Sequence, residues 1–265
     1  MNISIPILLY HQVTPNLHPD FFAYSVSPAT FKIHMKILKV LGFNSINLDQ
    51  LENYRNGKTT LPRKPILITF DDCFQESVDY AVPILKAYGF TSVFFVPTEC
   101  IGGKSHWLMP ELGIEFPIID WRTVKFLDSN GFKIGSHTMS HPYLSKMSPD
   151  DCFKELDGSR KVLEDYLGHE IVHLAYPYGD FNKSVSSIAA EAGYRSACSC
   201  IEGFATAEDD PLVLPRIYII GQENLLDLII KLHTGRRWQT PRKLRLYAYS
   251  KLRGLKRLFN RILSK

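Results

Sequence analysis

The feature that most constrains the fold is an alternation of short apolar runs with longer stretches of helical spacing. Seven runs rich in β-branched and aromatic residues are typical of buried strands, namely 5–10, 66–70, 92–96, 132–136, 171–175, 194–199 and 214–220. Six segments between them have helical spacing, namely 28–41, 76–88, 121–130, 149–167, 183–192 and 223–233. About seven βα units predict an α/β fold with a parallel sheet, either open or closed into a barrel.

One long segment, residues 97–120, interrupts this alternation and carries aromatic residues and prolines of its own. A loop of this length in a compact domain is often a lid or a groove wall, and the alternative is a neutral insertion. The sequence leaves both interpretations open.

The composition is that of an ordinary globular protein. Of the 265 residues, 45% are hydrophobic and 22% are charged, and no stretch approaches the roughly 20 apolar residues of a membrane-spanning helix. The start of the chain lacks the basic region and long apolar run of a signal peptide. Five cysteines without a CxxC pair favour reduced thiols. We therefore expect a cytoplasmic location, with a peripheral position at the inner membrane face as the alternative.

Positive charge is concentrated at the C-terminal end. Residues 236–265 carry eleven Lys and Arg and no Asp or Glu, which leaves 20 basic against 27 acidic residues in the rest of the chain. Apolar residues within 241–263 recur every three or four positions, which predicts a basic amphipathic helix. Peripheral contact of 241–265 with an anionic membrane and packing against the rest of the protein both stay open, and no motif supports nucleic-acid binding. We divide the chain into a domain at 1–235 and a basic tail at 236–265.

Residues able to do chemistry follow three of the predicted strands. His11 follows the first, Asp71 and Asp72 follow the second, and His137 follows the fourth, with His141 four residues further on. In parallel α/β folds the carboxyl ends of the strands meet at one rim, where functional sites gather. We therefore expect these side chains to lie close together.

Two histidines and one aspartate form a ligand set that catalytic zinc uses, with three protein ligands and one open position. The second aspartate is then free to act as a base toward water. Adjacent aspartates, an HxxxH spacing and the YPYGD stretch at 176–180 are each common alone, as turns, helix caps or solvated helix faces. Their joint occurrence, each after an apolar run, predicts a metal site.

Three segments resemble, in order and spacing, the first three motifs of the polysaccharide deacetylases, the NodB-homology group of carbohydrate esterase family 4. They are TFDD at 69–72, SHTMSH at 136–141 and LAYPYGD at 174–180. Two further segments, 89–102 and LPRI at 214–217, are also similar, and the resemblance covers about residues 3–225. It implies a distorted (β/α) barrel of about seven parallel strands, with the basic C-terminal helix as an addition.

The resemblance also implies a role for each matching residue. Asp71 is expected to be the catalytic base, and Asp72, His137 and His141 are expected to bind a divalent metal. Zn²⁺ is the expected ion, with Co²⁺ or Ni²⁺ as alternatives. The backbone N–H of Tyr178 is expected to stabilise the oxyanion that forms during amide hydrolysis.

The chain departs from the usual family pattern at two points. Ala175 stands where many members have an arginine that supports the base, and AYPYG instead resembles the poly-N-acetylglucosamine deacetylases. We interpret Arg216 as the substitute, with an ordinary surface arginine as the alternative. The acid that the leaving amine requires is assigned to His11, by similarity to the YH motif of that subgroup, with His233 as its rival. The other histidines have no motif support: His18, His34, His106, His169 and His173.

Cys73 occupies the position where the family usually has glycine. A tolerated small residue is one interpretation, and a soft metal ligand or impaired activity is the other. The sequence as a whole predicts a metal-dependent N-deacetylase of N-acetylated sugars in a glycan or glycan precursor. A deacylase of a lipid-linked sugar at the membrane face and a catalytically impaired glycan-binding relative are the alternatives.

Overall fold

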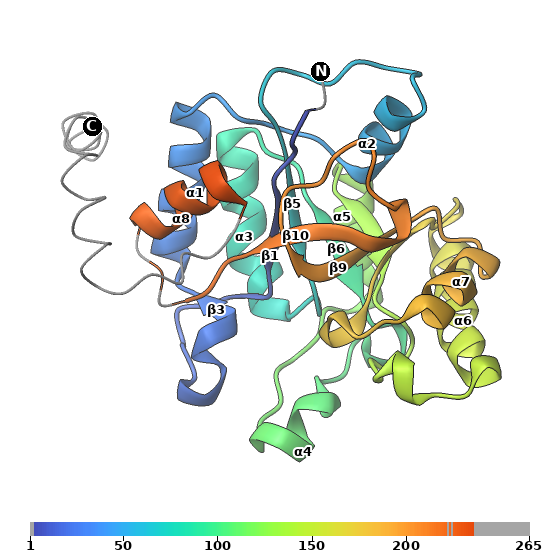
Figure 1. Ribbon diagram of the computed structural model, residues 1–265. Coiled ribbons are helices and arrows are strands. Elements are labelled where there is room, and N and C mark those ends of the chain that lie inside the picture. The colour runs from blue at the N-terminus through green and yellow to red at the C-terminus, as the bar shows by residue number, and fades with distance from the viewer. Residues whose placement is uncertain (1–2, 222, 224, 236–265) are drawn as a thin grey trace, which may run out of the picture.

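The computed structural model describes residues 3–221, 223 and 225–235, and its centre is a closed barrel of parallel strands (Figure 1). The barrel strands are β1 (Ile7–Tyr10), β5 (Pro65–Phe70), β6 (Val93–Val96), β7 (Lys133–Ser136), β8 (His173–Ala175), β9 (Ser196–Glu202) and β10 (Leu214–Tyr218). The order around the barrel is β1-β10-β9-β8-β7-β6-β5, and β5 pairs again with β1. The predicted seven-stranded parallel barrel is confirmed, and each barrel strand overlaps one of the seven predicted runs.

Three short strands lie outside this ring. β2 (Gln12–Val13) pairs with β3 (Ser25–Val26), and β4 (Asn44–Ser45) adds to the start of β5. The seam that closes the barrel is regular, because β1 and β5 are in register from Ile7↔Leu67 to Tyr10↔Phe70. This register brings the chain after Tyr10 beside the chain after Phe70.

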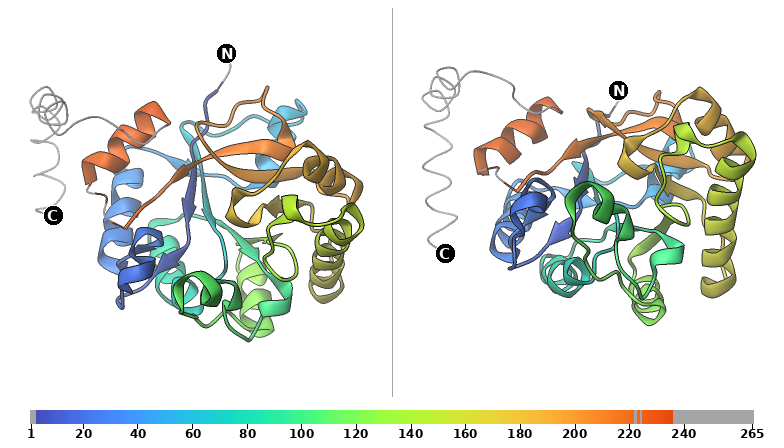
Figure 2. Two further views of the ribbon diagram at one scale, coloured as in Figure 1. Left: turned by 60° about the horizontal axis from the view of Figure 1, so that its bottom comes forward. Right: turned by 90° about the horizontal axis from the view of Figure 1, so that it is seen from below.

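Helices surround the barrel (Figures 1 and 2). They are α1 (Pro28–Val40), α2 (Leu48–Arg55), α3 (Gln75–Tyr88), α4 (Met109–Leu112), α5 (Trp121–Ser129), α6 (Pro149–Leu167), α7 (Lys183–Glu191) and α8 (Leu225–Thr234). All six predicted helices are present, with boundaries shifted by at most two residues. The sequence reasoning missed α4 and also α2, whose capping box between Asn47 and Gln50 is a signal that could have revealed it.

The barrel is distorted because its βα alternation is incomplete. The connection from β9 to β10 contains only the short 3₁₀ turn η6 (Pro211–Val213), where a regular barrel would have a helix. Other 3₁₀ turns are η1 (Pro19–Tyr24), η2 (Thr98–Cys100), η3 (His106–Leu108), η4 (Leu144–Lys146) and η5 (Pro177–Gly179). Figure 2 looks toward the end of the barrel where α4 lies, which is the end to which β1 and β5 point.

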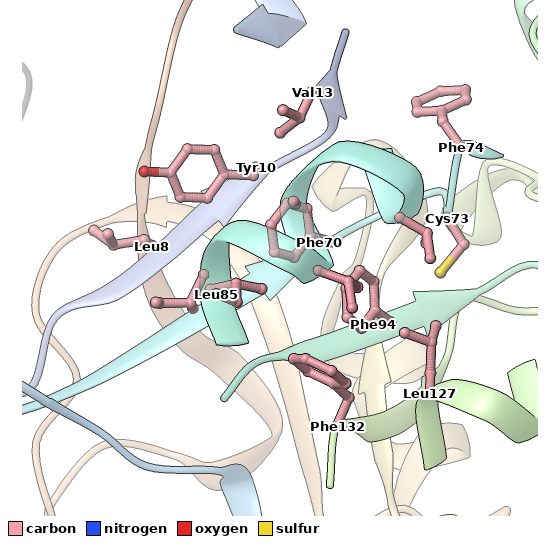
Figure 3. Close-up of a cluster of buried hydrophobic side chains, with 14 of the residues drawn as sticks. Leu8, Tyr10, Val13, Phe70, Cys73, Phe74, Leu85, Phe94, Leu127 and Phe132 are labelled. Carbon is pink, nitrogen blue, oxygen red and sulfur yellow. The ribbon is translucent and has the colours of Figure 1, made fainter. Parts of the chain in front are cut away.

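Strands β1, β5 and β6 are buried on both faces, as parallel strands covered by helices are. Inside the barrel, Leu67 and Phe95 pack in one apolar cluster, and Gly135 leaves room for the ring of Phe95, which a Cβ there would approach to 2.6 Å. Outside the barrel, a larger cluster joins the strands to the surrounding helices and includes Phe70 and Phe94, stacked at 4.9 Å (Figure 3).

In the part of the chain that the structure describes, no helix has the length and apolar character needed to cross a membrane. The predicted basic amphipathic helix at 241–263, and with it the tail at 236–265, lies outside the described residues.

Candidate active site at the carboxyl end of the barrel

The two adjacent aspartates leave the end of β5 in different directions. Successive residues of a strand point to opposite faces, so Asp71 continues the inward series of Leu67 and Thr69. Asp72 and Cys73 then adopt left-handed backbone conformations, with φ of 69° and 54°, which turn the chain sharply. Adjacent carboxylates can therefore have different partners, although both are buried.

Asp72 lies against the two histidines of the HxxxH segment. The Nε2 atoms of His137 and His141 are 3.4 Å and 3.2 Å from Oδ1 of Asp72, and the three ligand atoms all lie within 4.8 Å of one another. Two ligands of a tetrahedral zinc ion, each about 2.1 Å from the metal, are about 3.4 Å apart. The spacing of these atoms therefore fits a single divalent ion.

The position of the proton on the His137 ring also supports a bound cation. Its Nδ1 lies 2.7 Å from the carbonyl oxygen of Ala175, which can only accept, so Nδ1–H donates this hydrogen bond. Nε2 of the neutral ring then presents a lone pair to the carboxylate of Asp72. Two facing lone pairs repel each other unless a proton or a cation lies between them, as in the carbonyl–histidine–metal arrangement.

The local charges favour a cation here. Burial alone would raise the pKa of Asp72, but the close approach of His137 and His141 holds it well below its usual range. Burial would lower the pKa of His137, yet the nearby carboxylates of Asp72 and Asp71 raise it instead. The pKa of His141 is lowered, because burial outweighs its attraction to Asp72. These directions are those expected around a buried, ionised carboxylate.

Arg216 holds the other aspartate. Its two terminal nitrogens lie 2.7 Å from Oδ1 and Oδ2 of Asp71, and Nε donates to the carbonyl of Ser199 at 2.9 Å. The side chain of Arg216 is completely buried inside the barrel, so the surface-arginine alternative does not describe it. Burial would raise the pKa of Asp71, but the Arg216 guanidinium holds it below the usual range. Ala175, in the position of the usual family arginine, contributes its carbonyl to His137 instead.

His11 follows β1 beside this pair. The backbone N–H of Asp71 donates to the carbonyl of Tyr10 at 3.0 Å, so the two strand ends are adjacent. The ring of His11 lies between Tyr24 and Tyr218, with centroids at 5.2 Å and 6.3 Å. Its pKa is lowered, because burial outweighs the attraction of the two aspartates. Its buried Nδ1 has no hydrogen-bond partner within the described residues.

The rival histidine has different surroundings. His233 is exposed near the end of α8, and its Nδ1 bonds the carbonyl of Ile229 one turn earlier on the same helix. α8 packs against α1 on the outside of the barrel (Figure 1). Of the two histidines, His11 therefore lies beside the aspartate pair and His233 lies on an outer helix.

Aromatic rings form the rim of the site. Tyr178 has a left-handed backbone, with φ of 59°, and its ring stacks on Tyr143 at 3.9 Å and meets His141 edge-on at 4.6 Å. Trp107 from the 97–120 segment stacks on His141 at 4.3 Å, and Glu111 on α4 accepts from the Tyr143 hydroxyl at 3.1 Å. The segment thus lies against the site, as expected if it is a groove wall.

The thiol of Cys73 points away from the metal-binding atoms. Its Sγ donates to the carbonyl of Phe95 at 3.2 Å, and the residue is fully buried in the cluster outside the barrel (Figure 3). Burial, followed by the negative charges of Asp72 and Asp71, raises the pKa of this thiol well above its usual value. Cys73 is not in the group of ligand atoms that lie within 4.8 Å of one another, and its thiol bonds Phe95, so the geometry favours a packing residue over a metal ligand.

A second cluster of possible ligands lies at the opposite end of the barrel. Asp49, Glu52 and His173 also offer ligand atoms that lie within 4.8 Å of one another. Asp49 already pairs, however, with Lys133 at 2.7 Å and with His173 Nε2 at 2.8 Å. His173 Nδ1 bonds the Ser196 hydroxyl at 2.8 Å. The ammonium of Lys133 supplies the positive charge that a metal would bring, so His173 has a structural role here.

Comparison with known proteins places this site in a family. A family model described as polysaccharide deacetylase matches residues 58–197, which contain both aspartates, both histidines and the YPYGD turn. The chain belongs to the polysaccharide deacetylase family. The resemblance read from the TFDD, SHTMSH and LAYPYGD segments is thereby confirmed.

Relatives and solved structures agree with this membership. A poly-beta-1,6-N-acetyl-D-glucosamine N-deacetylase of Staphylococcus aureus (strain MRSA252) is 26% identical over 205 residues, which are 74% of this chain and 68% of the relative. The structure of the Streptococcus pyogenes deacetylase PplD in complex with acetate has a TM-score of 0.76 at 25% identity and covers 88% of this chain and 99% of that one. IcaB from Ammonifex degensii shares the fold, with a TM-score of 0.74 at 22% identity over 88% of this chain and 97% of that one.

Sequence reasoning missed several residues that contact the proposed ligands or support the loop between them. Trp107 lies in a segment without a motif, and the carbonyl of Ala175 acts through its backbone, which no residue type reveals. Glu155 binds the loop between the two histidines but looks, in sequence, like any acidic residue of a helix.

Proposed function

We propose that this protein is a divalent-metal-dependent N-deacetylase that hydrolyses the acetamido group of an N-acetylated sugar in a glycan or glycan precursor. One observation carries the proposal: a metal-binding set of one aspartate and two histidines lies beside a second aspartate held by a buried arginine. The family membership and the similarity to a poly-N-acetylglucosamine deacetylase support the substrate class.

Asp72, His137 and His141 would hold the ion, for which Zn²⁺ suits the imidazole and carboxylate ligands and Co²⁺ or Ni²⁺ are alternatives. When bound, the ion would polarise the acetyl carbonyl and lower the pKa of water to about 7. The aromatic rings of Trp107 and Tyr178 cover His141 and limit the access of bulk water to this ligand.

Asp71 is proposed to accept the proton of the attacking water. Each of its oxygens receives one bond from Arg216, and a carboxylate oxygen has a second lone pair that stays available. Arg216 therefore orients the carboxylate and keeps it ionised, so we assign it a positioning role. As the carbonyl carbon becomes tetrahedral, the backbone N–H of Tyr178 is proposed to stabilise the negative oxygen.

His11 is proposed to give a proton to the amide nitrogen as the C–N bond breaks. The products are acetate and a primary amine, and water supplies the oxygen that acetate gains. The buried Nδ1 of His11 has no partner among the described residues, which leaves that atom available to carry and release a proton.

A panel of N-acetylated sugars tests the proposal. Free, polymeric, nucleotide-linked and lipid-linked substrates would be assayed for released amine with added Zn²⁺, Co²⁺ or Ni²⁺. We expect metal-dependent acetate release from a glycan substrate. Turnover of the lipid-linked sugar alone would instead favour the membrane-face deacylase, and glycan binding without any acetate release would favour the impaired relative.

A further inference from the structure

The loop between the two histidines has an irregular backbone that needs external support. Thr138 and His141 both lie in the left-handed region, with φ of 66° and 62°. Such conformations are unfavourable for residues other than glycine and persist only when the surrounding structure imposes them. Because His141 belongs to this loop, the accuracy of its ring position depends on what holds the loop.

Side chains, rather than a regular ladder, accept all four backbone N–H groups of this loop. Ser136 Oγ accepts from Thr138 and Thr138 Oγ1 accepts from His141, each at 3.1 Å. Oε2 of Glu155 accepts from Met139 at 2.9 Å and from Ser140 at 3.0 Å. One carboxylate oxygen on a neighbouring helix therefore satisfies half of these donors.

α6 is shaped to bring Glu155 to the loop. Oε1 of Glu155 accepts from the Ser140 hydroxyl at 2.7 Å, so the Glu155 carboxylate makes three hydrogen bonds to two adjacent residues. One turn along the helix, Gly158 leaves space for Met139, whose sulfur would lie 2.4 Å from a Cβ there. Next to it, Ser159 bonds Ser136 at 2.8 Å. Three residues of α6, namely Glu155, Gly158 and Ser159, thus contact the loop or the end of the strand before it.

We propose that Glu155 is a positioning residue for metal binding, which fixes the loop so that His141 faces Asp72. This inference rests on the proposed metal site. Glu155 makes no bond to the three proposed ligand side chains and acts through the backbone between them. Its role depends on the reach of its side chain and on the one oxygen that accepts both backbone N–H groups, rather than on its charge.

Two conservative substitutions separate reach from charge. Glu155→Gln keeps the length, since its amide oxygen can accept both N–H groups and its NH₂ can donate to the Ser140 hydroxyl. Glu155→Asp keeps the charge but retracts the carboxylate by about 1.5 Å, one C–C bond length, which takes it out of hydrogen-bonding range. Lys154→Ala, at an exposed position of the same helix, serves as the matched control.

The readouts are the Kd for Co²⁺, the visible spectrum of the Co²⁺-loaded protein and the free energy of unfolding of the metal-free protein. Supporting residues outside a metal's ligands are typically worth ten- to a hundredfold in affinity, so we expect Glu155→Asp to weaken Co²⁺ binding by at least about tenfold and to alter the spectrum. Glu155→Gln should stay within about fivefold of the unaltered protein, because it loses only the charge assistance of its bonds. Lys154→Ala should leave the Co²⁺ affinity and the spectrum unchanged.

Unchanged Co²⁺ affinity and spectrum in Glu155→Asp would overturn the inference, even if its unfolding free energy fell, because Glu155 would then be merely structural. Equal weakening in both variants would also overturn it, since charge rather than reach would be responsible. If the unaltered protein bound no Co²⁺, Zn²⁺ or Ni²⁺, the proposed function would fail as well, which distinguishes the two failures.

Discussion

Removing Arg216 should expose how much the barrel depends on its buried ion pair. None of the Arg216 side chain and 4% of the Asp71 side chain is exposed, and two bonds of 2.7 Å join them. Replacement by methionine fills similar volume but leaves the carboxylate buried without a counter-charge. Breaking a buried pair from one side costs about 3–5 kcal/mol. The orphaned carbonyl of Ser199 adds about 1 kcal/mol.

The assay is urea unfolding of the metal-free protein at pH 7, with Arg195→Met as the control. The Arg195 side chain is half exposed and lies 3.5 Å from its acidic partners, so its loss should cost about 1 kcal/mol or less. The double variant Asp71→Asn with Arg216→Met should be more stable than the sum of the single changes predicts, by at least about 2 kcal/mol. The loss in Arg216→Met should also shrink as the pH falls from 7 to 5. Without its guanidinium partner, the pKa of the buried Asp71 carboxyl rises above its unfolded value, so the folded variant gains stability by taking up a proton.

Two results would refute this reasoning. A loss below about 1 kcal/mol in Arg216→Met would mean that the barrel solvates Asp71 without the guanidinium. Strict additivity in the double variant would mean that the two residues do not interact energetically. Either result would also remove the physical basis for assigning Arg216 the role of the missing family arginine.

Two other residues give sharp tests. Replacing Cys73 by glycine relieves a left-handed backbone conformation that costs about 1–2 kcal/mol, but it also removes a buried side chain worth about 1 kcal/mol. The free energy of unfolding should therefore change by about 1 kcal/mol or less, and Co²⁺ affinity should not change. A thiolate-to-Co²⁺ charge-transfer band that disappears in this variant would instead make Cys73 a ligand. His34 is buried against the hydroxyl of Tyr10 at 3.0 Å, and its burial, together with the charge of Lys231, lowers its pKa to about 4. The unfolded chain therefore binds a proton at His34 below about pH 6.5 that the folded protein does not bind until about pH 4, so the free energy of unfolding should fall by about 2 kcal/mol between pH 7 and 4.5. In His34→Gln this part of the fall should be absent, as measured by urea unfolding at both pH values, and an identical fall in the two proteins would contradict the assignment.

Much of the fold could be predicted because its causes are local in sequence. Parallel barrel strands are buried on both faces, so runs such as 66–70 and 92–96 are continuously apolar and easily recognised. The placement of Asp72, His137 and His141 followed from the rule that strand ends share one rim. α2 was missed because only Leu48 and Leu51 of its eight residues are buried, which leaves little apolar periodicity to detect.

The rest depends on contacts between distant parts of the chain. The direction of the Cys73 thiol follows from two successive left-handed residues, which residue types do not reveal outside glycine. The carbonyl of Ala175 that orients His137 belongs to the backbone of another strand. Glu155 reaches the histidine loop from a helix that begins eight residues after His141, and its sequence surroundings resemble any solvated helix.

The central claim is that Asp71 and His137, at the same rim, perform separable tasks. One preparation each of the unaltered protein, Asp71→Asn and His137→Ala would be measured for bound Zn²⁺ and for acetate released from an N-acetylated glycan, with folding checked by circular dichroism. Our expectation is that Asp71→Asn retains Zn²⁺ and loses acetate release, whereas His137→Ala loses both. Full acetate release by either variant, or full Zn²⁺ binding by His137→Ala, would contradict it.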